Sequence, residues 1–137
     1  MQTKNYNSEL LKQDTELKNY VLYQLEICVK EQFYKEVSLI LGYAPTPTSK
    51  SWLVEFRSNE KGKENVDFVD YFLSILDGKY DELKQIGINR YDIFIWYVYY
   101  SAGHCNMEFS PEQMYKLGKE GISLLVSCYD ADNEICK

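Results

Sequence analysis

The chain has 137 residues, of which 45% are hydrophobic and 15% aromatic, and its formal net charge is −6. This length and apolar content predict one folded domain and exclude an intrinsically disordered chain. The negative charge, with no cluster of Lys or Arg to offset it, argues against nucleic acid or an anionic membrane as a partner, because both repel an acidic surface.

The two ends of the chain are more polar than its middle. Residues 1–16 carry few apolar positions and predict an N-terminal arm or loose helix, whereas residues 131–137 predict a polar C-terminal tail. Residues 17–130 are therefore the expected single domain. The N-terminal residues do not have the pattern of a signal peptide, and no run of 18 apolar residues occurs, so we expect a cytoplasmic protein.

Four cysteines, at positions 28, 105, 128 and 136, lack the close spacing of a disulfide-rich scaffold. We expect reduced thiols, with Cys28 and Cys128 acting as small apolar residues of strands. His104 is the single histidine and is followed by Cys105 without a CxxC or HxxxH motif, so the sequence predicts no metal site and no cofactor. A turn is the expected structure there.

The first half of the chain predicts a strand, a helix and a second strand. Apolar residues alternate over 21–29, as in a strand with one half-wet face, and helical spacing over 31–41 ends at Gly42. Two prolines then impose an extended loop, and alternation over 52–57 predicts the next strand.

The second half begins with apolar residues at helical spacing over 64–76, ended by Asp77 and Gly78, and a short helical turn over 80–86. Residues 91–100 are apolar or aromatic on both faces and predict an interior strand. Residues 107–109 are a candidate short edge strand. Ser110, Pro111 and Gln113 then form a capping-box pattern for a last helix, and alternation from Ile122 predicts the final strand.

This order of elements predicts an α+β fold. We expect a four- or five-stranded sheet, mixed or mostly antiparallel, with about three helices packed mainly on one face, because each amphipathic helix has one stripe to bury. The opposite face must then carry either Phe94, Trp96 and Tyr100 or Tyr97 and Tyr99. That face is a candidate interface.

Two groups of residues suggest chemistry but have simpler interpretations. The aromatic run at 91–100 resembles a stacking platform for bases or sugars, yet an interior strand or a protein interface needs the same residues, and no basic groove accompanies them. Asp67 and Asp70 have the spacing of a carboxylate pair on one helix face, but no partner His, Lys or Arg is near in sequence. A solvated helix face explains them.

Four segments carry a resemblance to a known family: LGYAPT at 41–46, KSW at 50–52, the helix from Phe72 to Leu83 with its break at Asp77, and FSPEQ at 109–113 leading to SCY at 127–129. In this order they resemble an uncharacterised bacterial family described as a domain of unknown function. The resemblance covers roughly residues 17–129. It implies structural turns and strand ends and no catalytic motif, and chains of this size and acidity are similar to immunity partners of bacterial toxins.

We therefore predict a non-enzymatic, cytosolic protein-binding module, an immunity-type or regulatory protein whose partner is another protein, basic at its contact surface. A homodimer stays open. The alternative is a small-molecule-binding domain or an enzyme with a pocket between sheet and helices. The candidate residues for a pocket are Trp52, Asp92 and Tyr97, and those for a partner surface are the acidic Asp130, Asp132 and Glu134.

Overall fold

The computed structural model describes residues 19–47 and 49–130. Within these ranges the chain forms one four-stranded sheet, four α-helices and two short 3-10 helices, which confirms the α+β prediction. The strands are β1 (Tyr20–Ile27), β2 (Trp52–Arg57), β3 (Ile93–Ser101) and β4 (Ser123–Asp130). The helices are α2 (Tyr34–Leu41), α3 (Phe68–Leu76), α4 (Tyr80–Gln85) and α5 (Pro111–Glu120), with 3-10 helices η1 (Glu31–Phe33) and η2 (Arg90–Asp92). The predicted arm at 1–16 and tail at 131–137 lie outside the described residues.

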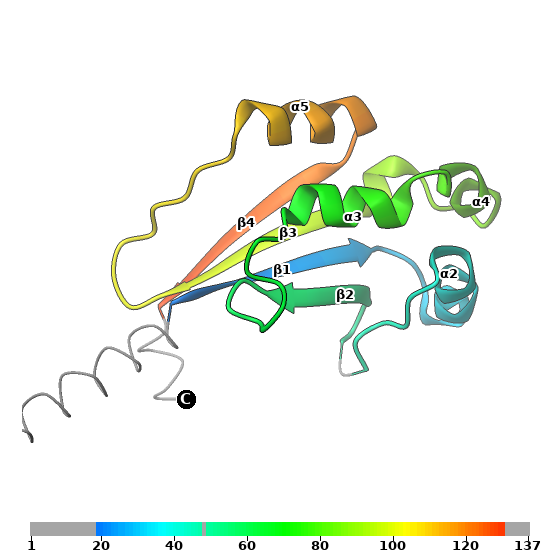
Figure 1. Cartoon of the computed structure of the whole chain (residues 1–137). Helices are drawn as coiled ribbons and strands as arrows, with labels where there is room; N and C mark the ends of the chain where they lie inside the picture. Colours follow the sequence, from blue (N-terminus) through cyan, green and yellow to red (C-terminus); the bar gives the residue numbers. More distant parts are fainter. Residues whose placement is uncertain (1–18, 48, 131–137) are drawn as a thin grey trace, which may run out of the picture.

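The strands lie in the order β2-β1-β3-β4. Strand β1 is antiparallel to both of its neighbours, whereas β3 and β4 are parallel. Parallel strands need a crossover connection, and α5 provides it between β3 and β4 (Figure 1). The sheet is therefore mixed, as predicted. Residues 107–109 are not paired with any strand, so the fifth strand that the sequence allowed is not part of this sheet.

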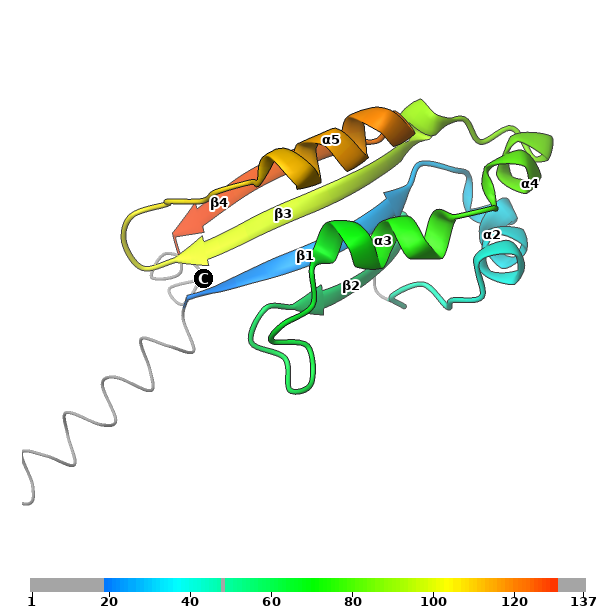
Figure 2. The ribbon, with the colours of Figure 1, turned by 45° about the horizontal axis from the view of Figure 1, so that its top comes forward.

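The helices cover one face of the sheet. Helices α3 and α5 lie over that face, α5 above β3 and β4, while α2 and α4 gather at one end of the sheet (Figures 1 and 2). Between the layers lies the hydrophobic core, whose largest fully buried side chains include Trp52, Phe72 and Leu25. No helix among residues 19–47 and 49–130 lies over the other face.

Strand β3 is interior, as its sequence predicts, because it is paired with β1 on one side and β4 on the other. The expectation that both of its faces are buried needs correction. Ile93 and Ile95 point into the core and are 1% and 0% exposed, but Phe94, Trp96 and Tyr100 on the other face are only partly buried. Aromatic residues can occupy such a face because the side chains of the neighbouring strands pack beside them and cover part of each ring.

Two side chains set the helix starts. Ser110 Oγ accepts from Gln113 N at 3.1 Å, and Gln113 Oε1 accepts from Ser110 N at 3.0 Å, which forms the predicted capping box of α5. Helix α3 begins later than position 64, because Asp67 is its cap and accepts from the backbone N–H groups of Val69 and Asp70. First-turn backbone N–H groups of both helices therefore have a side-chain acceptor.

Replacement of Ser110 by alanine is expected to lower the free energy of unfolding by about 1 kcal/mol, because one first-turn N–H of α5 loses its acceptor. Urea denaturation of the variant and of a Ser123→Ala control, whose side chain lies exposed at the start of β4, measures the difference. Equal midpoints for the two variants would contradict this role for Ser110.

An aromatic cluster fills the layer between α3 and the sheet. Tyr23 stacks on Phe68 with ring centroids 4.6 Å apart and meets Phe56 and Tyr97 at 5.0 and 5.7 Å. Burial, with smaller contributions from Tyr97 and Asp67, raises the pKa of Tyr23 to about 12. The tyrosine of an unfolded chain titrates near pH 10, so the folded chain holds this proton over a wider range.

Because the folded-state pKa is raised, the stability that depends on neutral Tyr23 is complete below about pH 10 and is lost as the pH rises towards about 12. We expect the Tyr23→Phe variant to lose less stability than the wild type over this window, since phenylalanine has no proton to release. Denaturant midpoints measured at pH values across the window provide the comparison. An equally steep loss in the variant would show that Tyr23 does not carry the effect.

Candidate functional site

The face of the sheet away from the helices, called here the open face, is the largest candidate site. Strand alternation and the pairing register place fifteen side chains on it. They are Tyr20, Leu22, Gln24 and Glu26 of β1; Leu53, Glu55 and Arg57 of β2; Phe94, Trp96, Val98 and Tyr100 of β3; and Ser123, Leu125, Ser127 and Tyr129 of β4. Nine of the fifteen are aromatic or aliphatic, which is typical of the centre of a protein interface.

A row of tyrosines crosses one end of the open face. The rings of Tyr20 and Tyr100 stack with centroids 4.9 Å apart, and those of Tyr100 and Tyr129 with centroids 5.3 Å apart. The guanidinium of Arg57 lies over Tyr20, 5.0 Å from its ring centroid. The row therefore spans all four strands and ends at the outer edge of β4 with Tyr129, which is 48% exposed.

The orientation of these rings limits what they can bind. Neighbouring strands are about 4.8 Å apart, so rings stacked at this spacing stand upright on the sheet and turn their edges outwards. The ring faces of Tyr100 contact Tyr20 and Tyr129, and Arg57 covers a face of Tyr20. A base or a sugar ring needs a free aromatic face, so the stacked rings of Tyr20 and Tyr100 do not favour the platform that the aromatic run suggested.

Polar groups at the other end of the open face converge on Glu26. Its Oε1 accepts from Trp96 Nε1 at 3.0 Å, and its Oε2 accepts from Ser51 Oγ at 2.6 Å. These bonds fix the indole of Trp96 against the sheet. Next to them, Gln24 Nε2 donates to Glu55 Oε2 at 2.7 Å. The groups of the face that are charged at neutral pH are thus the carboxylates of Glu26 and Glu55 and the guanidinium of Arg57, which leaves the face slightly negative.

A shallow hollow of about 270 Å³ lies in the middle of the open face. Leu22, Val98 and Ser127, which are register neighbours on three strands, line it together with Trp96, Tyr100 and Tyr129 and with the polar Gln24 and Glu26. A hollow of this shape fits a side chain of a partner protein and is small for a separate ligand, since ligand pockets usually hold about 300–1,000 Å³.

The three predicted pocket residues do not share a site. Trp52 is fully buried in the core and its indole Nε1 donates to Ser38 Oγ at 3.0 Å. Asp92 ends η2, where its Oδ2 accepts from Asn89 N at 2.9 Å. Tyr97 lies in the aromatic cluster under α3, where it is paired with Tyr23 of β1. Trp52 is paired with Ile27, which lies four residues further along β1. Each residue has a structural contact of its own.

The predicted acidic surface is only partly described. Asp130 is exposed at the end of β4, whereas Asp132 and Glu134 lie outside the described residues. The acids that the structure places beside the aromatic face are instead Glu26 and Glu55. Alternation along β1 and β2 assigns each of them a face, but their position next to Trp96 and Gln24 depends on the strand register, which the sequence does not give.

Asp67 and Asp70 have separate structural contacts. Asp67 caps α3, and Asp70 Oδ1 forms an ion pair of 2.7 Å with Lys116 Nζ on α5. Lys116 also meets Glu112 at 3.1 Å, and hydrogen bonds to both carboxylates raise the pKa of Lys116 to about 12. These contacts tie α3 to α5.

A second candidate site is a groove of about 590 Å³ between α3 and α5. Leu73 and Tyr115 contribute its apolar side chains, and the polar ones include Asp70 of α3 and the acids and lysines of α5. The hydroxyl of Tyr80 is buried in this region next to Glu120, and burial, followed by the charge of Glu120, raises the pKa of Tyr80 to about 12. The groove has the size of a small-molecule site.

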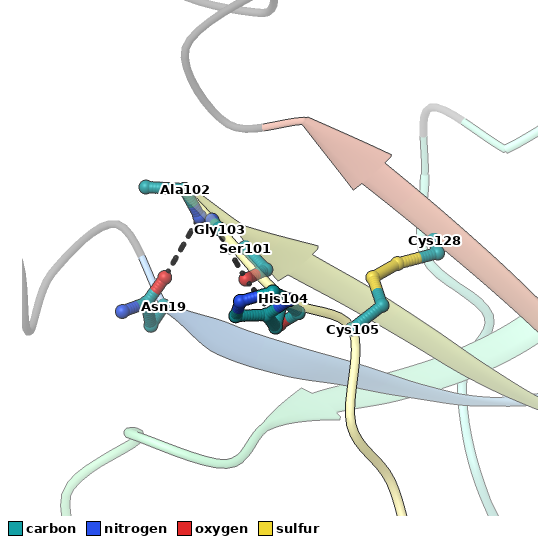
Figure 3. Close-up of a disulfide and its surroundings, with 7 residues drawn as sticks. All are labelled: Asn19, Ser101, Ala102, Gly103, His104, Cys105 and Cys128. Carbon is teal, nitrogen blue, oxygen red and sulfur yellow. Dashed lines mark hydrogen bonds between the residues drawn. A yellow bond between two sulfur atoms is a disulfide. The ribbon is translucent and has the colours of Figure 1, made fainter.

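The loop that follows β3 carries a disulfide between Cys105 and Cys128 of β4 (Figure 3). The turn before it is held by Asn19 Oδ1, which accepts from Ala102 N at 3.0 Å, and by Ser101 Oγ, which donates to the carbonyl oxygen of His104 at 3.0 Å. The expectation of reduced thiols is wrong for this pair, because the crossover returns β4 beside the loop. Disulfides are typical of oxidising compartments, so a cytoplasmic location stays a prediction.

Cys28 is a free thiol and is exposed just beyond β1, whereas Cys136 lies outside the described residues. Within residues 19–47 and 49–130, no three His, Cys, Asp or Glu side chains come together in a way that would hold a metal ion. The helices of this part of the chain are all too short or too polar to cross a membrane.

The open face and the groove between α3 and α5 are two arrangements that offer the chemistry of a binding site. The first offers an upright aromatic row, a fixed indole and a slight negative charge, and the second offers a polar cleft. The resemblance to a bacterial domain of unknown function stays a prediction. Comparison of the chain with protein-family models, with curated proteins and with solved structures finds no match.

Proposed function

We propose that this protein binds another protein through the open face, as an immunity-type or regulatory protein does, and does not act as an enzyme. The observation that carries the proposal is the sheet face that carries nine apolar side chains, Trp96 among them, and that no helix of the described residues covers. Contiguous apolar faces of this kind usually mark interaction sites in proteins.

The composition of the open face supports a protein partner. Tyrosine, tryptophan and arginine are the residues that most often dominate binding energy, and the face carries all three. Glu26 already holds Trp96 in place, so little side-chain freedom is lost on binding. The carboxylate of Glu55, which is exposed, is available to a cationic group of the partner.

The charge of the whole chain supports a partner that is basic at its contact surface. A net charge of −6 attracts such a partner over distance and speeds encounter, and salt weakens this effect. We therefore expect a protein that is captured at low ionic strength and released at high ionic strength, with an association rate that falls as salt is added.

A matched pair of charge reversals tests the position of the contact. Glu55→Lys and Glu82→Lys change the net charge equally, but Glu55 lies on the open face and Glu82 lies exposed on α4 in the helix layer. With the captured partner purified, we expect Glu55→Lys to slow association roughly tenfold and Glu82→Lys to change it far less. Equal effects of the two variants, or an association rate that does not change with salt concentration, would count against the proposal.

The groove between α3 and α5 favours a second candidate function, the binding of a small molecule, because its volume of about 590 Å³ lies in the range of ligand pockets. A small molecule bound there would contact Tyr115, which is 68% exposed and far from the open face. Loss of activity or binding in a Tyr115→Ala variant would favour this candidate.

A further inference from the structure

Strand β4 is an edge strand whose outer side has no backbone partner within residues 19–47 and 49–130. It pairs with β3 on its inner side, and the backbone hydrogen bonds outside helices and strands do not involve residues 123–129. The opposite edge is different. Thr46 N donates to Leu53 O at 2.8 Å, so the loop before β2 covers part of that edge.

The sequence of β4 does not protect this edge. Residues 123–129 read SLLVSCY, without a charge, a proline or a glycine, whereas the shorter edge strand β2 carries Glu55 and Arg57. Proteins usually blunt an exposed edge with charges, prolines or a covering segment, because unpaired N–H and C=O groups recruit another strand. A long neutral edge is therefore suited to strand pairing.

Apolar side chains lie beside the same edge. Val126 and Tyr129 of β4 are 44% and 48% exposed, and Met114 of α5 is 56% exposed. Gln113 and Lys116 of α5 bond to α3, and Leu117 is buried against the sheet. By helical geometry, Met114 and Gly118 therefore lie on the flank of α5 away from α3, which is the side of the outer edge of β4.

We propose that a second copy of this chain pairs with β4 along this edge, antiparallel and around a two-fold axis at Val126. In this register all of residues 123–129 are paired: Val126 meets Val126 of the second copy, Leu125 meets Ser127, and Ser123 meets Tyr129. The two sheets then form one continuous sheet, and the α5 helices flank each other through Met114 and Gly118.

The neutral paired segments and the charges at their ends support a second copy as the occupant. Two chains of net charge −6 repel each other, but the paired segments carry no charge. The same register brings Asp130 opposite Ile122 of the second copy. There the Arg90 side chain lies close, with its Cδ 3.6 Å from the position of a Cβ on Gly121. The guanidinium of Arg90 already pairs with Glu120 at 3.0 Å and lies over the ring of Tyr80, so each Asp130 would add a second carboxylate beside this arginine of the other copy.

The dimer leaves the open face free, so this inference stands apart from the proposed function. Sedimentation equilibrium of the full chain is expected to give twice the chain mass of 16.2 kDa. Val126→Glu and Val126→Lys place like charges opposite each other at the axis, and each variant alone is expected to sediment as a monomer. A one-to-one mixture of the two variants is expected to restore the dimer, since glutamate then faces lysine.

Leu39→Glu serves as the control, because Leu39 is 76% exposed on α2, away from β4, and this variant is expected to stay dimeric. The mixture keeps the test valid if one substitution loosens the strand, since an unfolded variant cannot restore a dimer. A wild-type monomer at every concentration would overturn the proposal, as would dimers of both Val126 variants alone. The proposal would also be overturned by a monomer in which the β4 amides are protected from hydrogen exchange only when a different protein is bound. That result would show that the edge pairs with a strand of another protein.

Discussion

Replacement of Trp52 by alanine is expected to lower the free energy of unfolding by about 3–5 kcal/mol. The indole is fully buried, and its removal leaves a cavity in the core at the start of β2. The side chain also donates to Ser38 Oγ of α2 at 3.0 Å, so the variant loses the link between the sheet and that helix. Urea denaturation followed by circular dichroism measures the loss.

Two companion variants are compared with Trp52→Ala, one for the lost hydrogen bond and one for the loss of a less buried tryptophan. Ser38→Ala removes the acceptor but keeps the indole, and it is expected to cost about 1 kcal/mol. Trp96→Ala removes the second tryptophan, which is only half-buried on the open face, and it is expected to cost less than Trp52→Ala. Similar losses for the two tryptophan variants would show that Trp52 is not the core residue described here.

Trp96→Ala is expected to weaken binding of the protein partner by about 2 kcal/mol or more, which is roughly a 30-fold rise in Kd. Trp96 lies on an interior strand at the border of the hollow, and Glu26 fixes its indole, so it has the features of an interface anchor. Tyr115→Ala is the matched control, because it removes an exposed aromatic side chain from α5 in the opposite layer.

The two effects can be distinguished from unfolding. Both variants should keep the circular dichroism spectrum of the wild type at the temperature of the binding assay. Calorimetric titration at that temperature then measures their affinity for the partner. Retained affinity in Trp96→Ala together with lost affinity in Tyr115→Ala would move the binding site to the groove between α3 and α5.

Local patterns in the sequence predicted much of the fold. Strand β3 could be recognised because the eight consecutive apolar or aromatic residues from Ile93 to Tyr100 suit an interior strand, and Ser110 and Gln113 indicate the start of α5 through a reciprocal cap. These signals act within a few residues. Asp67 belongs to the same class, since an aspartate ahead of an apolar helix is a typical cap, although its spacing to Asp70 suggested a carboxylate pair.

The site depends on contacts between residues that are distant in the sequence, and no local sequence pattern indicates these contacts. Trp52 and Trp96 each alternate within a strand, and only the sheet order and helix placement decide that the first lies in the core and the second on the open face. The tyrosine row needs the registers of three strands. Cys105 and Cys128 are 23 residues apart and meet only because the β3 to β4 connection is parallel.

The central claim is that the open face is the surface on which a protein partner binds, and the intrinsic fluorescence of the chain tests it directly. The chain has two tryptophans: Trp52 is fully buried, and Trp96 lies half-buried on the open face. Quenching by acrylamide, a neutral molecule, therefore reports mainly on Trp96.

A partner that contains no tryptophan, or whose tryptophans are replaced, is added at saturation. We predict that quenching falls severalfold in the complex, because the partner covers Trp96. Unchanged quenching at saturation would contradict the claim and place the contact elsewhere on the molecule.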